Sequence, residues 1–175
     1  QFDSAAEHLV RLPDVASMLS RCDLLGMRVA IVGFGRFGRA VFRALLQAPV
    51  CEHPVEGAAP RTVEVVDRQG TFRAPHAARD AEAAGWLLTE SPHRDAEAWT
   101  ADTLRTPPTL VFFCTDDDSL NLRCAALLRE AGGEGIEIVL RMTNPIREGE
   151  QRLRGITVHS VAELLRAKLE QTFRP

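Results

Sequence analysis

Short apolar runs alternate along the chain with longer stretches whose apolar residues recur at helical spacing. Residues 28–32 and 62–66 are β-branched runs, and residues 109–114 are apolar at every position after Thr109, as in a strand covered on both faces. Further strands are predicted at residues 86–89, 136–140 and 156–158. Helices are predicted at residues 37–47, 76–84, 94–104, 118–131, 146–153 and 161–172.

This alternation predicts an α/β fold: a Rossmann-like doubly wound parallel sheet of about six strands with helices on both faces. Residues 27–175 form the predicted domain. Residues 1–26 stand outside the alternation and contain amphipathic helical turns interrupted at Pro13, so we interpret them as a linker or packing arm. Residues 48–60 carry three prolines and a glycine and predict a loop insertion.

The composition narrows the function classes. The chain has 175 residues and a formal net charge of −3, so no overall basic charge favours nucleic acid as a partner. Its four cysteines lack zinc-like spacing and are interpreted as reduced thiols of a cytoplasmic protein. No apolar run approaches the ~18 residues of a membrane span. The first residue is not Met, and we expect the chain to be a piece of a longer protein.

The strongest motif follows the first predicted strand directly and opens the next helix. It comprises Gly33, Phe34, Gly35, Arg36, Phe37 and Gly38. Gly33 allows a tight turn, Gly35 leaves room for a pyrophosphate against the backbone, and Gly38 lets the helix pack close to the strand. Free N–H groups at the helix start then favour a phosphate. The motif predicts a dinucleotide-binding loop.

Charged residues beside this loop indicate how a nucleotide is held. Arg36 opposes the helix dipole unless an anion is bound, so it is a candidate phosphate clamp, and Arg39 is a weaker one. Asp67 ends the second strand, where a carboxylate accepts hydrogen bonds from ribose hydroxyls and repels a 2′-phosphate. This favours NAD(H) or an adenine nucleotide over NADP(H). Arg68 follows at once and offers a 2′-phosphate site as the alternative.

The end of the fourth predicted strand supplies a second wall for the site. In a doubly wound sheet, ligands lie at the carboxyl ends of the strands, so Thr115 and Asp116 are expected beside the glycine loop. Asp118 or Ser119 is expected to cap the following helix. Asp116, Asp117 and Asp118 are consecutive, but neighbouring side chains diverge and no further ligand completes a shell, so we predict no metal site.

These motifs together resemble the nucleotide-binding TrkA-N, or RCK, domain. The resemblance covers about residues 27–170. It lies in Val-Gly-Phe-Gly-Arg-Phe-Gly (32–38), the acid Asp67, Cys-Thr-Asp-Asp-Asp with Asn121 (114–121) and Val-Leu-Arg (139–141). Domains of this family regulate potassium channels, uptake systems and efflux systems. The resemblance therefore implies a cytosolic regulatory domain, in the same chain as a membrane channel or transporter or as its partner.

The resemblance also implies how the ligand is contacted. The pyrophosphate would meet residues 33–37, the ribose would meet Asp67, and Thr115 and Asp116 would border the nicotinamide-ribose or phosphate side. Arg141 would face the ligand or a dimer partner. Family members form homodimers and bind NAD(H), ATP/ADP or AMP as effectors without turning them over. We expect NAD(H), with the adenine nucleotides as alternatives.

The alternative hypothesis is the cofactor-binding fragment of an NAD-dependent dehydrogenase, because such enzymes begin with the same glycine loop. They need a second domain that brings substrate to the nicotinamide, and the residues after the sixth predicted strand are too few for one. Cys114 ends an apolar strand and is interpreted as a buried structural thiol. No histidine lies in a base–nucleophile pattern. We therefore predict no catalytic residue and no enzymatic activity.

Overall fold

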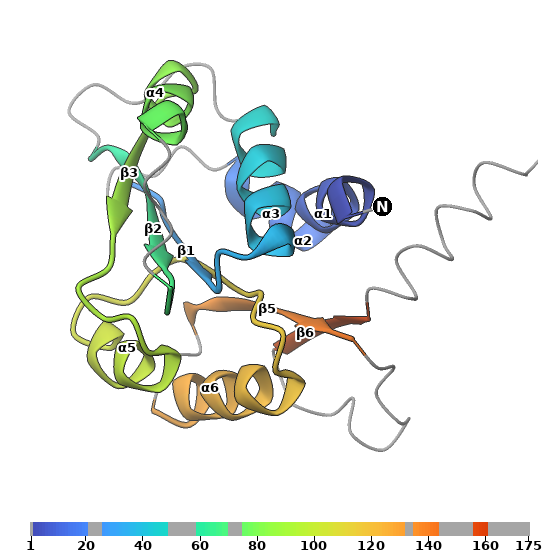
Figure 1. Cartoon of the computed structure of the whole chain (residues 1–175), viewed down its shortest axis with the longest axis vertical. Helices are drawn as coiled ribbons and strands as arrows, with labels where there is room; N and C mark the ends of the chain where they lie inside the picture. Colours follow the sequence, from blue (N-terminus) through green and yellow to red (C-terminus); the bar gives the residue numbers. More distant parts are fainter. Residues whose placement is uncertain are drawn as a thin grey trace, which may run out of the picture.

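A six-stranded parallel sheet forms the centre of the computed structural model (Figure 1). The structure describes residues 2–20, 26–48, 59–69, 75–131, 135–143 and 156–160. The strand order is β3-β2-β1-β4-β5-β6, and every neighbouring pair is parallel. The strands are β1 (Arg28–Val32), β2 (Arg61–Val66), β3 (Trp86–Glu90), β4 (Leu110–Phe113), β5 (Glu137–Met142) and β6 (Ile156–Ser160).

Helices cover both faces of this sheet (Figure 1). They are α1 (Phe2–Val10), α2 (Pro13–Leu19), α3 (Arg36–Gln47), α4 (Pro75–Ala83), α5 (Ala96–Thr103) and α6 (Asp118–Glu130). The first four pack on one face, while α5 and α6 pack on the other. Helices on both faces and this strand order confirm the predicted doubly wound Rossmann-like fold.

The alternation of side chains in β1 explains how one strand serves two cores. Val29 and Ile31 belong to the apolar cluster under α1–α4, whereas Ala30 and Val32 belong to the cluster under α5 and α6. Successive residues of a strand point to opposite faces of the sheet, so a central strand must be apolar at every position. Residues 110–113 of β4 are fully buried for the same reason.

The N-terminal segment is packed against the sheet domain. Helix α1 lies along α3 and buries an apolar face. Phe2 meets the ring of Phe37 edge-on, with ring centroids 6.2 Å apart. Asp3 pairs with Arg43 of α3, and the hydrogen bond from that guanidinium holds the pKa of the Asp3 carboxyl below its ordinary value. Helix α1 thereby covers the helix that begins at the glycine loop.

The predicted elements and the observed ones agree closely. All six predicted strands are present, with ends shifted by a residue or two; β5 extends to Met142. The predicted helices at 146–153 and 161–172 and most of the 48–60 insertion lie outside the described residues. Within the described ranges, no helix combines the length and apolar character needed to cross a membrane.

Candidate nucleotide-binding site

A cleft of about 650 Å³ lies at the carboxyl ends of β1, β2 and β4. Strands β1 and β4 are neighbours in the sheet, but the chain leaves them towards opposite faces, into α3 and α6. This is the topological switch point, where open α/β sheets bind ligands. The lining comprises Val32, Gly33, Phe34, Gly35, Arg36, Arg39, Val66, Asp67, Arg68, Gln69, Arg94, Asp95, Ala96, Cys114, Thr115, Asp116, Asp117 and Leu120.

The three glycines of the loop have three different surroundings. Gly33 has φ +92°, and a Cβ there would lie 2.7 Å from the backbone nitrogen of Thr115. A Cβ at Gly38 would collide with the carbonyl oxygen of Gly33. A Cβ at Gly35 would meet nothing within 4 Å. Gly33 and Gly38 are therefore required by the fold, whereas none of the residues that the structure describes requires a glycine at position 35.

The N-terminus of α3 is left open towards the cleft. Its N-cap residue is Gly35, which has no side chain to accept hydrogen bonds from the first-turn N–H groups. The first turn also contains no acidic residue. Arg39 uses its Nε to donate to the carbonyl oxygen of Phe34, at 3.2 Å. The partial positive charge of the helix end is therefore not neutralised by a cap or an acid of its own first turn.

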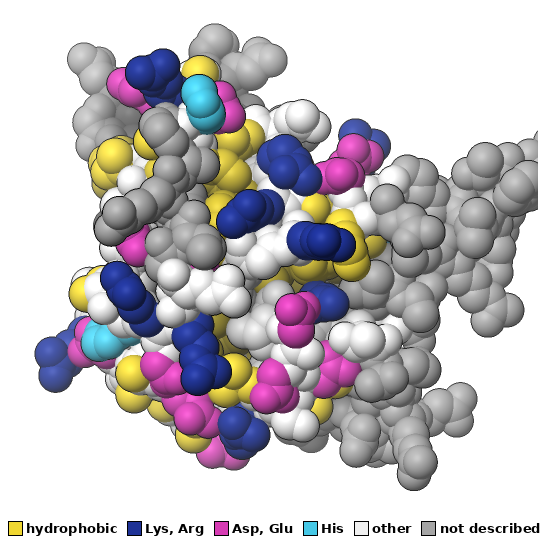
Figure 2. Space-filling view, in the orientation of Figure 1, with side chains coloured by type: hydrophobic (Ala, Val, Ile, Leu, Met, Phe, Trp, Pro, Cys, Tyr) yellow, Lys and Arg dark blue, Asp and Glu magenta, His cyan; other side chains and the backbone are white. Residues whose placement is uncertain are grey.

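Arginines from three elements border the same cleft. Arg36 lies in the first turn of α3, Arg68 follows β2, and Arg94 precedes α5; all three are exposed. None of the three has an ion-pair partner among the residues that the structure describes. Figure 2 shows Lys and Arg side chains over both the α3 and the α5 sides of this face. An anion can therefore pair with an arginine on either side of the cleft, although the lining also contains Asp67, Asp95, Asp116 and Asp117.

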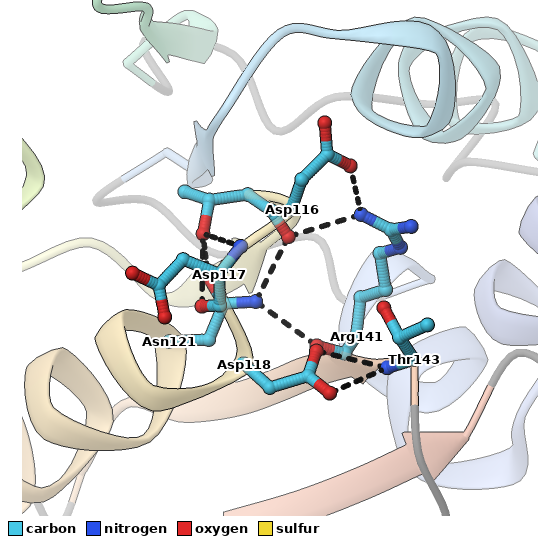
Figure 3. Close-up of polar contacts among 7 residues, drawn as sticks. Asp116, Asp117, Asp118, Asn121, Arg141 and Thr143 are labelled. Atoms are coloured by element: carbon cyan, nitrogen blue, oxygen red, sulfur yellow. Dashed lines mark hydrogen bonds and ion pairs between the residues drawn. The ribbon is translucent and has the colours of Figure 1, made fainter.

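A buried polar network holds the wall opposite the glycine loop (Figure 3). Asn121 of α6 is 0% exposed. Its Nδ2 donates to the carbonyl oxygens of Thr115, at 3.1 Å, and Arg141, at 3.0 Å. The hydroxyl of Thr115 donates to Asn121 Oδ1 at 2.6 Å. One amide thereby joins the loop after β4, the first turns of α6 and the end of β5.

Arg141 of β5 makes two further hydrogen bonds to the same wall. Its Nη1 donates to the carbonyl oxygen of Thr115, at 3.0 Å, and to the carboxylate of Asp116. The guanidinium also lies over the ring of Phe37, with Cζ 5.4 Å from the centroid. The Arg141 side chain is 9% exposed, whereas that of Asp116 is 95% exposed. A buried cation is therefore covered by a carboxylate at the lip of the cleft.

Cys114 is the one thiol in the lining, and it is not a nucleophile at neutral pH. Burial raises its pKa to about 12, despite the opposing effect of the nearby Arg141 charge. A thiolate is needed for nucleophilic chemistry or metal binding, and this thiol stays protonated. The interpretation of Cys114 as a buried thiol is confirmed.

Comparison with known proteins identifies no family. No protein-family model matches the chain, and no curated protein sequence matches it. Among solved structures, glutamyl-tRNA reductase from Methanopyrus kandleri is similar, with a TM-score of 0.48 and 18% identity over 98% of this chain and 38% of that one. Alcohol dehydrogenase TADH from Thermus sp. ATN1 has a TM-score of 0.45 and 14% identity over 98% of this chain and 44% of that one.

The chain thus spans less than half the length of these two proteins. The identities and TM-scores are too low to transfer an activity or a ligand. The fold assignment rests instead on the strand order and helix positions described above, which are those of nucleotide-binding Rossmann domains.

Most of the predicted contact residues meet in the cleft. Its lining includes Gly33, Phe34, Gly35, Arg36, Asp67, Arg68, Thr115 and Asp116. The others, Phe37, Gly38 and Arg141, lie outside the lining. The side chain of Phe37 is buried between Phe2 and Arg141, and Gly38 packs on Gly33. The guanidinium of Arg141 is buried and pairs with Asp116, which itself belongs to the lining.

The predicted N-cap of α6, Asp118 or Ser119, was wrong by one or two residues. Asp117, and not Asp118 or Ser119, is the N-cap: its carboxylate accepts a hydrogen bond from Leu120 N–H at 2.9 Å. Asp118 instead accepts from Thr143 N–H at 2.8 and 3.0 Å, which ties α6 to the residue after β5. The three consecutive acids therefore have three separate partners. The described part of the chain contains no group of His, Cys, Asp or Glu side chains suited to a metal ion.

Several cleft residues are not predicted from the sequence, among them two with polar side chains. Arg94 and Gln69 lie in connections between elements, and only the three-dimensional fold brings them to the lining. Asn121 is part of the motif at residues 114–121, but the sequence pattern assigns it no contact. Its role as a buried connector depends on Arg141, which is distant in the sequence and adjacent in the sheet.

Proposed function

We propose that the cleft binds an adenine nucleotide as an effector, with its phosphates over the glycine loop. The observation that carries the proposal is the open space in front of Gly35 at the uncapped N-terminus of α3. First-turn N–H groups lack intrahelical partners and carry partial positive charge, so they suit a phosphate. A side chain at position 35 would fill the space that the phosphate needs.

The charges around the cleft support an anionic ligand with a ribose. Arg36 lies beside the helix terminus, where it can pair with a phosphate oxygen. Asp67 lies at the end of β2, next to β1, where it can accept hydrogen bonds from ribose hydroxyls. Since a carboxylate repels a 2′-phosphate, we infer NAD(H) in preference to NADP(H). ATP, ADP and AMP carry the same adenosine and phosphate groups and are the alternatives.

We further infer that this domain regulates a potassium channel or transporter from the cytosolic side. The support is the resemblance of its motifs at 32–38, 67, 114–121 and 139–141 to TrkA-N domains. A regulatory domain acts by differential affinity: the nucleotide favours one geometry of a homodimer, and that geometry biases an attached gate. No catalytic group is required, since the nucleotide is bound and released unchanged.

Titration of the chain by calorimetry with NADH, NAD, ATP and AMP tests the binding proposal. We expect saturable binding of at least one of them, and absence of binding by all four would overturn it. A hydride-transfer assay with NADH and small carbonyl compounds tests whether the chain has a catalytic activity of its own. Turnover would contradict the regulatory role, whereas unchanged NADH is expected both of a regulator and of a dehydrogenase fragment that lacks its catalytic domain.

A further inference from the structure

The two walls of the cleft are built differently. Asp67, on the β2 side, belongs to the wall that suits an adenosine ribose. The wall on the β4 side, by contrast, is fixed by hydrogen bonds from residues outside the lining, Asn121 and Arg141. The β4 side is where the second half of a dinucleotide would lie in this fold.

The carbonyl oxygen of Thr115 is the centre of the fixed wall. It accepts one hydrogen bond from Asn121 Nδ2, at 3.1 Å, and another from Arg141 Nη1, at 3.0 Å. A carbonyl oxygen has two lone pairs, so both are used by the protein. The backbone of Thr115 in turn packs against the turn at Gly33. Asn121 and Arg141, which lie outside the lining, therefore fix the position of this loop relative to the glycine loop.

The orientation of the Asn121 amide follows from its neighbours. Backbone carbonyls only accept hydrogen bonds, so the nitrogen must face Thr115 and Arg141, while Oδ1 accepts from the Thr115 hydroxyl. An isosteric carboxylate would replace the donor by an acceptor and leave two carbonyls facing it. The site therefore needs an amide, and not merely a side chain of this size.

We propose that Asn121 is a positioning residue for the half of a dinucleotide that lies beyond the pyrophosphate. It acts through Thr115, which it holds at the cleft wall, and makes no contact with the ligand itself. This inference rests on the proposed nucleotide site and deepens it. It favours a dinucleotide over a mononucleotide, because only a dinucleotide has a second half that can reach the β4 side of the cleft.

The test compares NADH with ADP in the unmodified chain and in Asn121→Asp. ADP retains the adenosine and the phosphates and lacks the distal half. We expect the unmodified chain to bind NADH more tightly than ADP. In Asn121→Asp we expect NADH to bind at least about tenfold more weakly, with the affinity for ADP changed by less than about twofold. Lower pH should restore part of the NADH affinity, because a protonated carboxyl can donate one hydrogen bond again.

Thr115→Val provides a second variant for the case in which Asn121→Asp does not fold. It removes the hydroxyl that donates to Oδ1 and that also bonds the backbone of Asp117, and we expect a loss for NADH in the same direction. Equal losses for NADH and ADP would overturn the inference, and so would equal affinities of the unmodified chain for both. Those results would leave the proposed nucleotide site intact. Absence of binding of either ligand to the unmodified chain would overturn both proposals.

Discussion

The carbonyl oxygen of Gly33 occupies the space that a Cβ on residue 38 would need. This contact joins the turn after β1 to the first turns of α3, so the strand and the helix approach each other as closely as their backbones allow. Neither side can yield easily, because the atoms that meet belong to backbone. Gly38 is thus needed for the packing of α3 against the turn after β1. It affects the ligand only indirectly, by holding the glycine loop in place.

Gly38→Ala is therefore expected to destabilise the protein. Overpacking against backbone costs about 1–3 kcal/mol, and thermal or denaturant unfolding measures the loss. Gly135→Ala is a suitable control, because a Cβ there meets no atom of the described residues within 4 Å. An unchanged unfolding midpoint for Gly38→Ala would refute the close approach of α3 to the turn at Gly33.

Gly35→Ala, unlike Gly38→Ala, is expected to affect nucleotide binding more than the stability of the fold. Its φ of −66° lies outside the left-handed region and its Cβ would meet no described atom within 4 Å, so the protein should fold, with a loss of at most about 1 kcal/mol because alanine is a poorer N-cap than glycine. The added methyl group occupies the space assigned to the phosphate, so nucleotide affinity should fall about tenfold, or about 1.4 kcal/mol. Calorimetric titration measures this. Retained affinity would mean that the phosphates do not lie against this backbone.

Arg36→Gln is expected to weaken nucleotide binding about tenfold, since a charge-assisted hydrogen bond contributes about 1.5–3 kcal/mol and solvent reduces its effect at an exposed site. The salt dependence of the affinity should decrease as well, because one charge is lost. Arg79→Gln is the matched control: Arg79 is an exposed arginine of α4 outside the cleft lining. Similar losses in both variants would indicate a general charge effect and no phosphate clamp.

The pH dependence of stability should report on Cys114. Its pKa is about 12 in the folded protein and 9.0 ordinarily, so the fold prefers the protonated thiol. The resulting stabilisation is complete below pH 9 and is lost as the pH rises towards 12. The chain contains no tyrosine, so no phenol titrates in this range. Denaturant unfolding of Cys114→Ala should show a shallower alkaline decline, and a slope equal to that of the unmodified chain would contradict the assignment.

The sequence predicts the elements well because their apolar patterns are distinct. The run at 109–114 has no polar interruption, which suits a central strand, and the glycines at 33 and 38 have geometric reasons that their spacing already indicates. The site could be predicted only where its residues are near in sequence or end a strand. Thr115 and Asp116 follow β4 directly, and both reach the lining.

What the sequence could not supply is the set of contacts between distant segments. Arg141 is predicted to face a ligand or a dimer partner, and the structure adds two contacts that the sequence pattern does not indicate, with Asp116 and the Thr115 carbonyl. The direction of a buried guanidinium depends on which acceptors the fold brings near it, and no periodicity encodes this. The prediction of the N-cap of α6 was wrong for a related reason. Three consecutive aspartates offer the same carboxylate, and only the backbone geometry selects Asp117 as the cap.

The most direct test of the nucleotide site is the dissociation constant of NADH for three proteins: the unmodified chain, Gly35→Asp and Gly135→Asp. Both substitutions add the same carboxylate at a glycine whose Cβ faces open space, but only Gly35 lines the cleft. We predict saturable binding by the unmodified chain and Gly135→Asp, and loss of binding by Gly35→Asp with its melting temperature retained. Equal affinity of Gly35→Asp and the unmodified chain would contradict the phosphate site at the N-terminus of α3.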